Sequence, residues 1–172
     1  MNKVTKELEG STSAIAYKGE VIVRAKRVNK LIKTFKIHNN AKPQFFYNVL
    51  HLIARDDGYR SSMPQYIKAF SGNEAVSLVS ILVEDVNVTW KSDIPRLALK
   101  FTLPYNTLTN NKIVDTYRLY SINAIDDTDY LVEATVDSDE NKISTDGKTN
   151  IVVEWVMTLS NSSTTTNTEV TK

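Results

Sequence analysis

The sequence predicts a mainly β protein, an antiparallel β-sandwich or jelly-roll-like domain with one amphipathic helix. Segments of strand length, in which apolar and polar residues alternate, recur along the chain with turn-forming residues between them. Helical spacing of apolar residues is clear in one stretch, near residue 50. With 172 residues, 41% of them hydrophobic, the chain is long enough for a single domain to bury a core without disulfides.

Two alternating segments near the N-terminus predict a β-hairpin. Residues 14–27 place Val21, Val23 and Ala25 on one face, and residues 31–39 alternate in the same way after a short link. Lysines occupy the outward positions of this hairpin, where they discourage pairing between sheet edges.

The amphipathic helix is predicted over about residues 42–56. Asn39 or Asn40 can cap its start, Pro43 suits a first turn whose N–H has no partner, and Gly58 can take the left-handed conformation past its end. Burying each large apolar side chain contributes roughly 1.5–3 kcal/mol before entropy is subtracted, so we expect a sheet to cover the apolar face. The residues of that face are Phe45, Phe46, Val49, Leu50, Leu52 and Ile53.

The chain after the helix predicts further strands up to residue 159. Residues 74–90 begin with an almost continuous apolar run, typical of a strand buried on both faces, and then alternate, so one bent strand and two strands are both compatible. Trp90 and Trp155 lie in apolar strands, and we expect both in the core. Further strands are predicted at residues 65–70, 96–103, 112–122, 130–136 and 149–160.

Both ends of the chain are polar. We expect residues 1–13 to form a flexible arm, residues 14–159 a single β-sandwich domain, and residues 160–172 a disordered tail of low complexity. No apolar run has the length of a signal peptide or a membrane span, so we expect a cytosolic protein without a membrane partner. Cysteine is absent, which excludes disulfides, thiolate catalysis and thiolate metal sites.

Charge is balanced overall but uneven along the chain. The formal net charge of +1 lacks the excess typical of nucleic-acid-binding proteins. Residues 1–42 carry a net charge of +7 and residues 104–159 a net charge of −6. Such segments can meet head to tail between identical copies, and a solvated, patchy surface is the equal alternative. The residues expected at subunit contacts are Lys18, Arg24, Lys26, Arg27, Lys33, Lys36, Asp126, Asp127, Asp129, Asp137, Asp139 and Glu140.

The sequence predicts no catalytic, metal or cofactor site. His38 and His51 lie in a strand and a helix without a recognisable nucleophile motif. The acidic loop at residues 137–148 begins like an EF-hand, but lysines stand where the sharp-turn glycine and the bidentate glutamate belong. Five glycines are scattered singly and form no phosphate-binding loop. We therefore expect a protein that is not an enzyme and needs no cofactor.

Two parts of the chain resemble small structural proteins of tailed bacteriophages. A basic strand followed by residues 35–57 is similar to the strand, Asn-containing turn and apolar helix that open several such proteins. Residues 98–136 and 143–161 resemble a β-sandwich ending with a strand, a motif close to Glu-x-Gly-Leu-Phe, an Ala-rich strand and a Thr-x-Trp strand, in that order. The last three places are taken by Tyr117-Arg118-Leu119-Tyr120, Glu133-Ala134-Thr135 and Glu154-Trp155-Val156.

The resemblance implies a non-enzymatic structural component of a phage virion, assembled in the host cytoplasm. The chain would be a repeated subunit of a neck or tail ring, of the capsid surface or of a fibre base. Its partners would be other virion proteins and copies of itself, with contacts through the terminal arms and the lysine-bearing face of the first hairpin. A carbohydrate- or receptor-binding β-sandwich module stays open as the alternative, and it would need exposed aromatic residues on one face.

Overall fold

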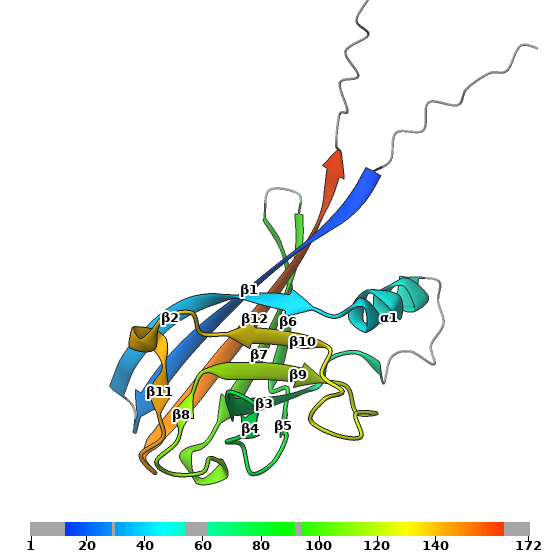
Figure 1. The fold of residues 1–172 in the computed structure, drawn as a ribbon. Helices are drawn as coiled ribbons and strands as arrows, with labels where there is room; N and C mark the ends of the chain where they lie inside the picture. The colour runs from blue at the N-terminus through cyan, green and yellow to red at the C-terminus, as the bar shows by residue number, and fades with distance from the viewer. Residues whose placement is uncertain (1–12, 29, 54–61, 92–93, 164–172) are drawn as a thin grey trace, which may run out of the picture.

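The computed structural model describes residues 13–28, 30–53, 62–91 and 94–163. The paired strands of these residues are antiparallel, and they form a strongly bent sheet with a helix at one end (Figure 1). The strands are β1 (Ser13–Arg27), β2 (Lys30–Ala41), β3 (Tyr66–Ser71), β4 (Glu74–Ala75), β5 (Ile81–Leu82), β6 (Asp85–Lys91), β7 (Ile94–Leu103), β8 (Ile113–Val114), β9 (Thr116–Tyr120), β10 (Val132–Thr135), β11 (Ile143–Ser144) and β12 (Thr149–Ser163); the helix is α1 (Pro43–Ile53), and η2 (Tyr105–Thr107) and η3 (Asp139–Asn141) are short 3₁₀ turns.

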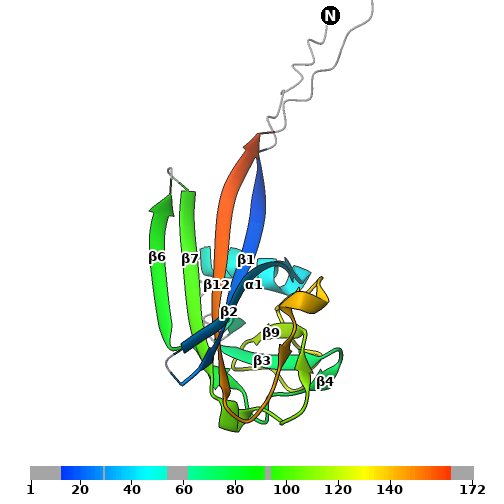
Figure 2. The same ribbon diagram turned by 90° about the vertical axis from the view of Figure 1, so that its left-hand side faces the viewer.

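The sheet folds over into two layers. The first layer has the strand order β2-β1-β12-β7-β6, and the second has the order β2-β10-β9-β3-β4, so that β2 is common to both. Strands β8 and β11 form a separate small ribbon. Figure 2 shows strands of the first layer next to one another, with β6 at the left as its open edge.

β2 passes from one layer to the other. Up to His38 it pairs with β1, and from Asn39 to Ala41 it pairs with β10. The Tyr17 hydroxyl donates a hydrogen bond of 2.8 Å to Asn39 Oδ1, and a Cβ placed on Gly19 would lie 1.7 Å from that oxygen. Glycine at position 19 therefore leaves the room that the buried Asn39 side chain needs where the sheet bends.

The chain crosses between the layers a second time after β5. β5 pairs with β3 in the second layer, whereas β6 pairs with β7 in the first. Between them, the N–H of Val83 donates to the Gln65 carbonyl and the N–H of Glu84 donates to the Lys100 carbonyl, both at 2.8 Å. The layers are thus joined on two sides, and the core is enclosed between them.

Large apolar side chains fill the space between the layers. On β1 the buried Val21, Val23 and Ala25 alternate with less buried residues, as the sequence predicts. The mainly β, sandwich-like fold with a helix is confirmed. The largest of the fully buried side chains between the layers are Trp155, Phe101, Leu103, Ile151, Val21 and Val23 from the first layer and Tyr117, Leu119 and Ile67 from the second.

The helix starts as predicted, but its predicted N-cap is wrong. Pro43 lies in the first turn of α1. Asn39 and Asn40 do not cap the helix, because both belong to β2, where they pair with β10. Residues 54–61, and with them Gly58, lie outside the described part of the chain.

The helix lies at one end of the sandwich, where it packs against β1 (Figure 1). Phe45 is buried against Tyr17, with ring centroids 5.6 Å apart, whereas Phe46 remains 38% exposed. The expected sheet-covered helix face is therefore only partly formed among the side chains that the structure describes. Of the described helices, none is long and apolar enough to span a membrane.

Residues 74–91 differ most from the prediction. In place of an apolar strand buried on both faces, the segment forms the two-residue strands β4 and β5 and then β6. Leu78, Val79 and Leu82 are each more than half exposed. The physical reason is position, because this segment lies at the edges of both layers and has sheet neighbours on one side only.

The C-terminal strand is longer than predicted. β12 reaches Ser163, and residues 160–163 pair with residues 13–16 of β1, although the sequence assigns them to a disordered tail. In a two-stranded ribbon the partner strand satisfies the backbone groups that face it and water satisfies the rest, so polar residues can form a strand without a core. Residues 1–12 of the predicted arm and residues 164–172 of the predicted tail lie outside the described part of the chain.

Candidate functional site

The apolar inner face of the first layer continues beyond the core onto the hairpin of β6 and β7. Val86 pairs with Leu99, Val88 with Leu97 and Trp90 with Pro95, so these residues share one face. Leu99 in turn pairs with the buried Trp155 of β12, which identifies this face as the one that carries the core. The second layer does not cover its outer part, since Val86, Val88 and Trp90 are 55%, 65% and 71% exposed.

The strands β1 and β12 form a second projection. They pair continuously from Ser13 opposite Ser163 to Arg27 opposite Thr149, and they rise out of the body as a two-stranded ribbon (Figures 1 and 2). The ring of Tyr17 on β1 makes edge contacts with Phe45 and Phe46 of the helix, at centroid distances of 5.6 and 5.4 Å. Burial raises the pKa of Tyr17 to about 12.

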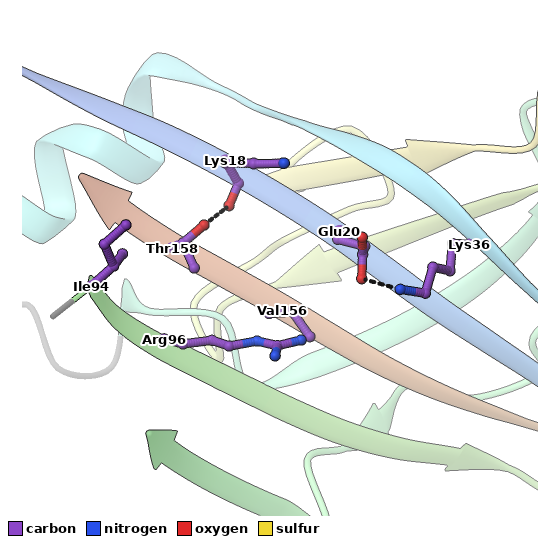
Figure 3. Close-up of a pocket in the computed structure, with 7 residues that line it drawn as sticks. All are labelled: Lys18, Glu20, Lys36, Ile94, Arg96, Val156 and Thr158. Carbon is purple, nitrogen blue, oxygen red and sulfur yellow. Dashed lines mark hydrogen bonds and ion pairs between the residues drawn. The ribbon is translucent and has the colours of Figure 1, made fainter. Parts of the chain in front are cut away.

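The outer face of the first layer carries a shallow basic groove, which Figure 3 shows in close-up. The groove has a volume of about 350 Å³. Lys36 Nζ lies 3.0 Å from Glu20 Oε1, whereas Lys18 and Arg96 have no ion-pair partner among the described residues. Three cationic side chains thus face one carboxylate. The lining residues are Lys18, Glu20, Lys36, Ile94, Arg96, Val156 and Thr158.

The basic residues expected at subunit contacts divide into two groups. Lys18, Arg24, Lys26 and Lys36 lie on the outer face of the first layer, since their positions alternate with those of the buried residues. Arg27 and Lys33 lie near the turn of the hairpin on the side of Ala25, since Lys33 pairs with Ala25 and both residues line one hollow with it.

Ion pairs and hydrogen bonds join the basic and acidic segments within one chain. Arg24 Nη1 lies 3.1 Å from Glu154 Oε2, and Arg27 forms an ion pair with Asp146. Lys33 Nζ donates to the carbonyl of Glu140. The segments of opposite net charge are thus neighbours in the fold and partly neutralise each other, because β1 pairs with β12. The assignment of these residues to subunit contacts stays a prediction.

Asp126, Asp127 and Asp129 lie in the connection between β9 and β10. The carboxylate of Asp126 accepts hydrogen bonds from the Thr128 hydroxyl (2.6 Å) and N–H (2.7 Å), and chiefly the hydroxyl holds the pKa of Asp126 below its usual value. Asp127 forms an ion pair of 2.6 Å with Lys68. Most of these oxygens stabilise the local turn and the sheet.

Asp137, Asp139 and Glu140 lie next to or within the turn η3. Asp139 is 2.7 Å from Lys142, and this hydrogen bond lowers the pKa of Asp139. The predicted acidic contact residues therefore occupy two separate loops and do not converge with the outer-face lysines into one site. Among the described residues, no group of His, Asp or Glu side chains is placed to hold a metal ion.

Arg118 is the residue of most unusual environment that the sequence analysis missed. It is 8% exposed, its Nε lies 2.6 Å from Glu133 Oε2, and its guanidinium stacks 4.4 Å from the centroid of Phe70 and 4.7 Å from that of Tyr130. Burial lowers the pKa of Arg118, but the hydrogen bond and charge of Glu133 outweigh this effect and raise it. These contacts of Arg118 stabilise the outer face of the second layer.

A second hollow lies beside this cluster, between the helix and the connection of β9 and β10. Its volume is about 340 Å³, and it combines aromatic rings with amide and carboxylate groups. Tyr47, Asn48, Asn123, Asp129 and Tyr130 are among its lining residues. No local sequence pattern predicts this hollow, because its lining comes from three segments that only the fold brings together.

Comparison of the chain with protein-family models, with curated proteins and with solved structures finds no match in any of the three.

Proposed function

We propose that this chain is a non-enzymatic structural subunit of a bacteriophage virion, repeated in a neck or tail ring or on the capsid surface. The observation that carries the assembly role is the uncovered apolar face of the hairpin of β6 and β7, with Val86, Val88 and Trp90 at its centre. Exposure of contiguous apolar residues on a projecting hairpin costs free energy in water, and a partner that covers them removes this cost.

The two projections support a role in assembly in another way. A subunit of a repeated structure must reach its neighbours, and the ribbon of β1 and β12 and the hairpin of β6 and β7 both extend beyond the body (Figure 2). The assignment to a phage particle rests on the resemblance of residues 35–57, 98–136 and 143–161 to phage structural proteins.

Incorporation into particles tests this proposal. Phage that lack the gene for this chain would be complemented with the wild type or with Trp90→Lys, and purified particles would be probed with an antibody to the chain. Ile125→Lys is the matched control, because Ile125 is 92% exposed in a loop far along the chain from the hairpin. We expect wild type and I125K in the particles and W90K outside them. Particles of normal composition and infectivity without the chain would overturn the proposal.

The hollow beside α1 favours one second candidate, a carbohydrate- or receptor-binding module. Tyr47 supplies exposed aromatic surface, and Asn123 and Asp129 supply exposed polar groups, a combination that suits sugar rings. A glycan array with the wild type and Tyr47→Ala tests it. Binding of one glycan class that Y47A abolishes would support this candidate, and an array without binding would contradict it.

A further inference from the structure

β6 leaves one edge of the first layer open. It pairs with β7 on one side, and no described strand lies on the other (Figure 2). The side chains from Asp85 to Trp90 are all exposed. Alternate backbone N–H and C=O groups of an edge strand point away from the sheet and can accept another strand.

The sequence of β6, DVNVTWK, matches a second copy of itself that runs in the opposite direction. Apolar residues then meet apolar residues, polar residues meet polar residues, and the charged ends meet with opposite signs. Val88 is the middle residue, apolar Val86 and Trp90 stand two positions to either side, and polar Asn87 and Thr89 stand between them. The ends carry opposite charges, with an aspartate at position 85 and a lysine at position 91.

We infer that β6 pairs antiparallel with β6 of a second copy of this chain, in a register centred on Val88. In this register Val88 lies opposite Val88 of the other copy and Val86 lies opposite Trp90, all on the apolar face. Asp85 of each copy lies opposite the lysine at position 91 of the other. A two-fold axis through the central pair brings the outward backbone groups of both copies together.

Other registers fit the chemistry less well. A shift of one residue places apolar side chains opposite polar ones and moves one set to the wrong face. A shift of two residues keeps the faces but removes Asp85 from its position opposite Lys91. Parallel pairing in register sets Asp85 against Asp85, which is destabilising because like charges then face each other.

This inference rests on the proposed function, because it supplies a contact between repeated subunits. It is nevertheless separable by experiment. If the copies pair in solution but particles never contain the chain, the pairing stands and the virion role falls. If particles contain the chain but the pairing assay on those particles is negative, the role stands and the pairing falls.

Disulfide trapping tests the register directly, since the chain has no native cysteine. Residues directly opposite in an antiparallel pair have Cβ atoms about 4.5–5.5 Å apart, close to the distance that a disulfide spans. We expect Val88→Cys to form a covalent dimer under mild oxidation at least about tenfold faster than Ile125→Cys. The control also carries a single cysteine, in a loop and at a position more exposed than Val88. Equal rates for the two variants would overturn the inference.

A mixing experiment with two further variants distinguishes the registers. Val86→Cys and Trp90→Cys should each cross-link slowly alone, because position 86 lies opposite position 90 of the other copy, and rapidly when mixed. Faster cross-linking of V86C with V88C than with W90C would place the strands in another register and contradict the inference.

Charge exchange supplies a non-covalent test. Asp85→Lys and Lys91→Asp should each weaken self-association by about tenfold, because two attractive pairs become repulsive, and the double variant should restore it. The two single variants should associate with each other in a mixture. Asp137→Lys controls for the change in net charge, since Asp137 lies near η3.

Native mass spectrometry over a range of concentrations gives the readout for charge exchange. A wild type that stays monomeric up to high concentration would overturn the inference. Hydrogen exchange would then report on the open edge itself. Protection, in that monomer, of the β6 amides that point away from β7 would mean that a segment of the same chain covers the edge, which also excludes a second copy there.

Discussion

Trp155 and Trp90 occupy the same face of the same layer, yet one is fully buried and the other is 71% exposed. Trp155 lies on β12, next to Leu99 of β7, and the second layer covers it. Trp90 lies near the end of β6, opposite Pro95, where the second layer no longer reaches. The alternation that marks a face as apolar therefore does not reveal whether anything covers it.

Residues of the same apolar type thus have different roles in the two regions. Apolar residues between the layers stabilise the fold, whereas the same kinds of residue on the projecting hairpin contribute little to it and remain available to a partner. The outer-face charges show a similar division, since Arg24 is paired with Glu154 but Arg96 has no ion-pair partner among the described residues.

Alanine at the two tryptophans tests this division with the largest effect. We expect Trp155→Ala to lower the free energy of unfolding by about 3–5 kcal/mol, because it opens a cavity in the core. Trp90→Ala should change it by less than about 0.5 kcal/mol. Urea unfolding followed by far-UV circular dichroism measures both. Similar losses for the two variants would mean that the hairpin face is covered in the folded monomer.

Gly19→Ala tests the bend of β2, on which coverage by the second layer depends. The new Cβ would collide with the buried Asn39 side chain, so we expect a loss of about 1–3 kcal/mol in the free energy of unfolding. Asn39→Ala in the same chain should recover part of that loss. Gly19→Ala and the double variant are compared by thermal unfolding; equal stability of the G19A variant and the wild type would show that the close approach is not required.

High pH should weaken the base of the ribbon through Tyr17. Its folded-state pKa of about 12 lies above the ordinary value of 10.0, so the folded protein holds the proton more tightly. The contribution of Tyr17 to the free energy of unfolding is complete below pH 10. It is lost as the pH rises from about 10 towards 12, at up to about 1.4 kcal/mol per pH unit.

Tyr17→Phe should flatten this loss, measured as the unfolding free energy between pH 9 and 12. Tyr117 and Tyr120, whose pKa values burial also raises, remain in both proteins and cancel in the difference. A wild type and a Y17F variant with the same pH dependence would contradict the role of Tyr17.

Val28→Asn should have the smallest effect of these substitutions. It changes a turn that contains neither tryptophan. Val28, in the turn between β1 and β2, has a φ of 55°, a left-handed conformation that a β-branched residue adopts only with strain. Asparagine tolerates this conformation, so we expect a gain of about 1 kcal/mol in the free energy of unfolding. Val28→Thr keeps the β-branch and should bring no gain; a gain of the same size for both variants would mean that strain is not the cause.

Much of the fold follows from local patterns. The strands β1, β2 and β7 were predictable from alternation, and Pro43 marked the helix start. The candidate surfaces were not predictable in the same way. Arg118 and Glu133 meet across neighbouring strands, and the hollow beside α1 is lined from separate segments, so no local signal links their residues.

The sequence alone determined which residues alternate, where turns interrupt them, and that a mainly β fold results, because side-chain periodicity and turn chemistry act within a few residues. Tertiary structure alone decided that Asn39 supports a bend instead of capping a helix, that residues 160–163 continue a strand, and that Trp90 stays uncovered. These outcomes depend on the layer packed opposite each face, and that layer comes from residues far away in the chain.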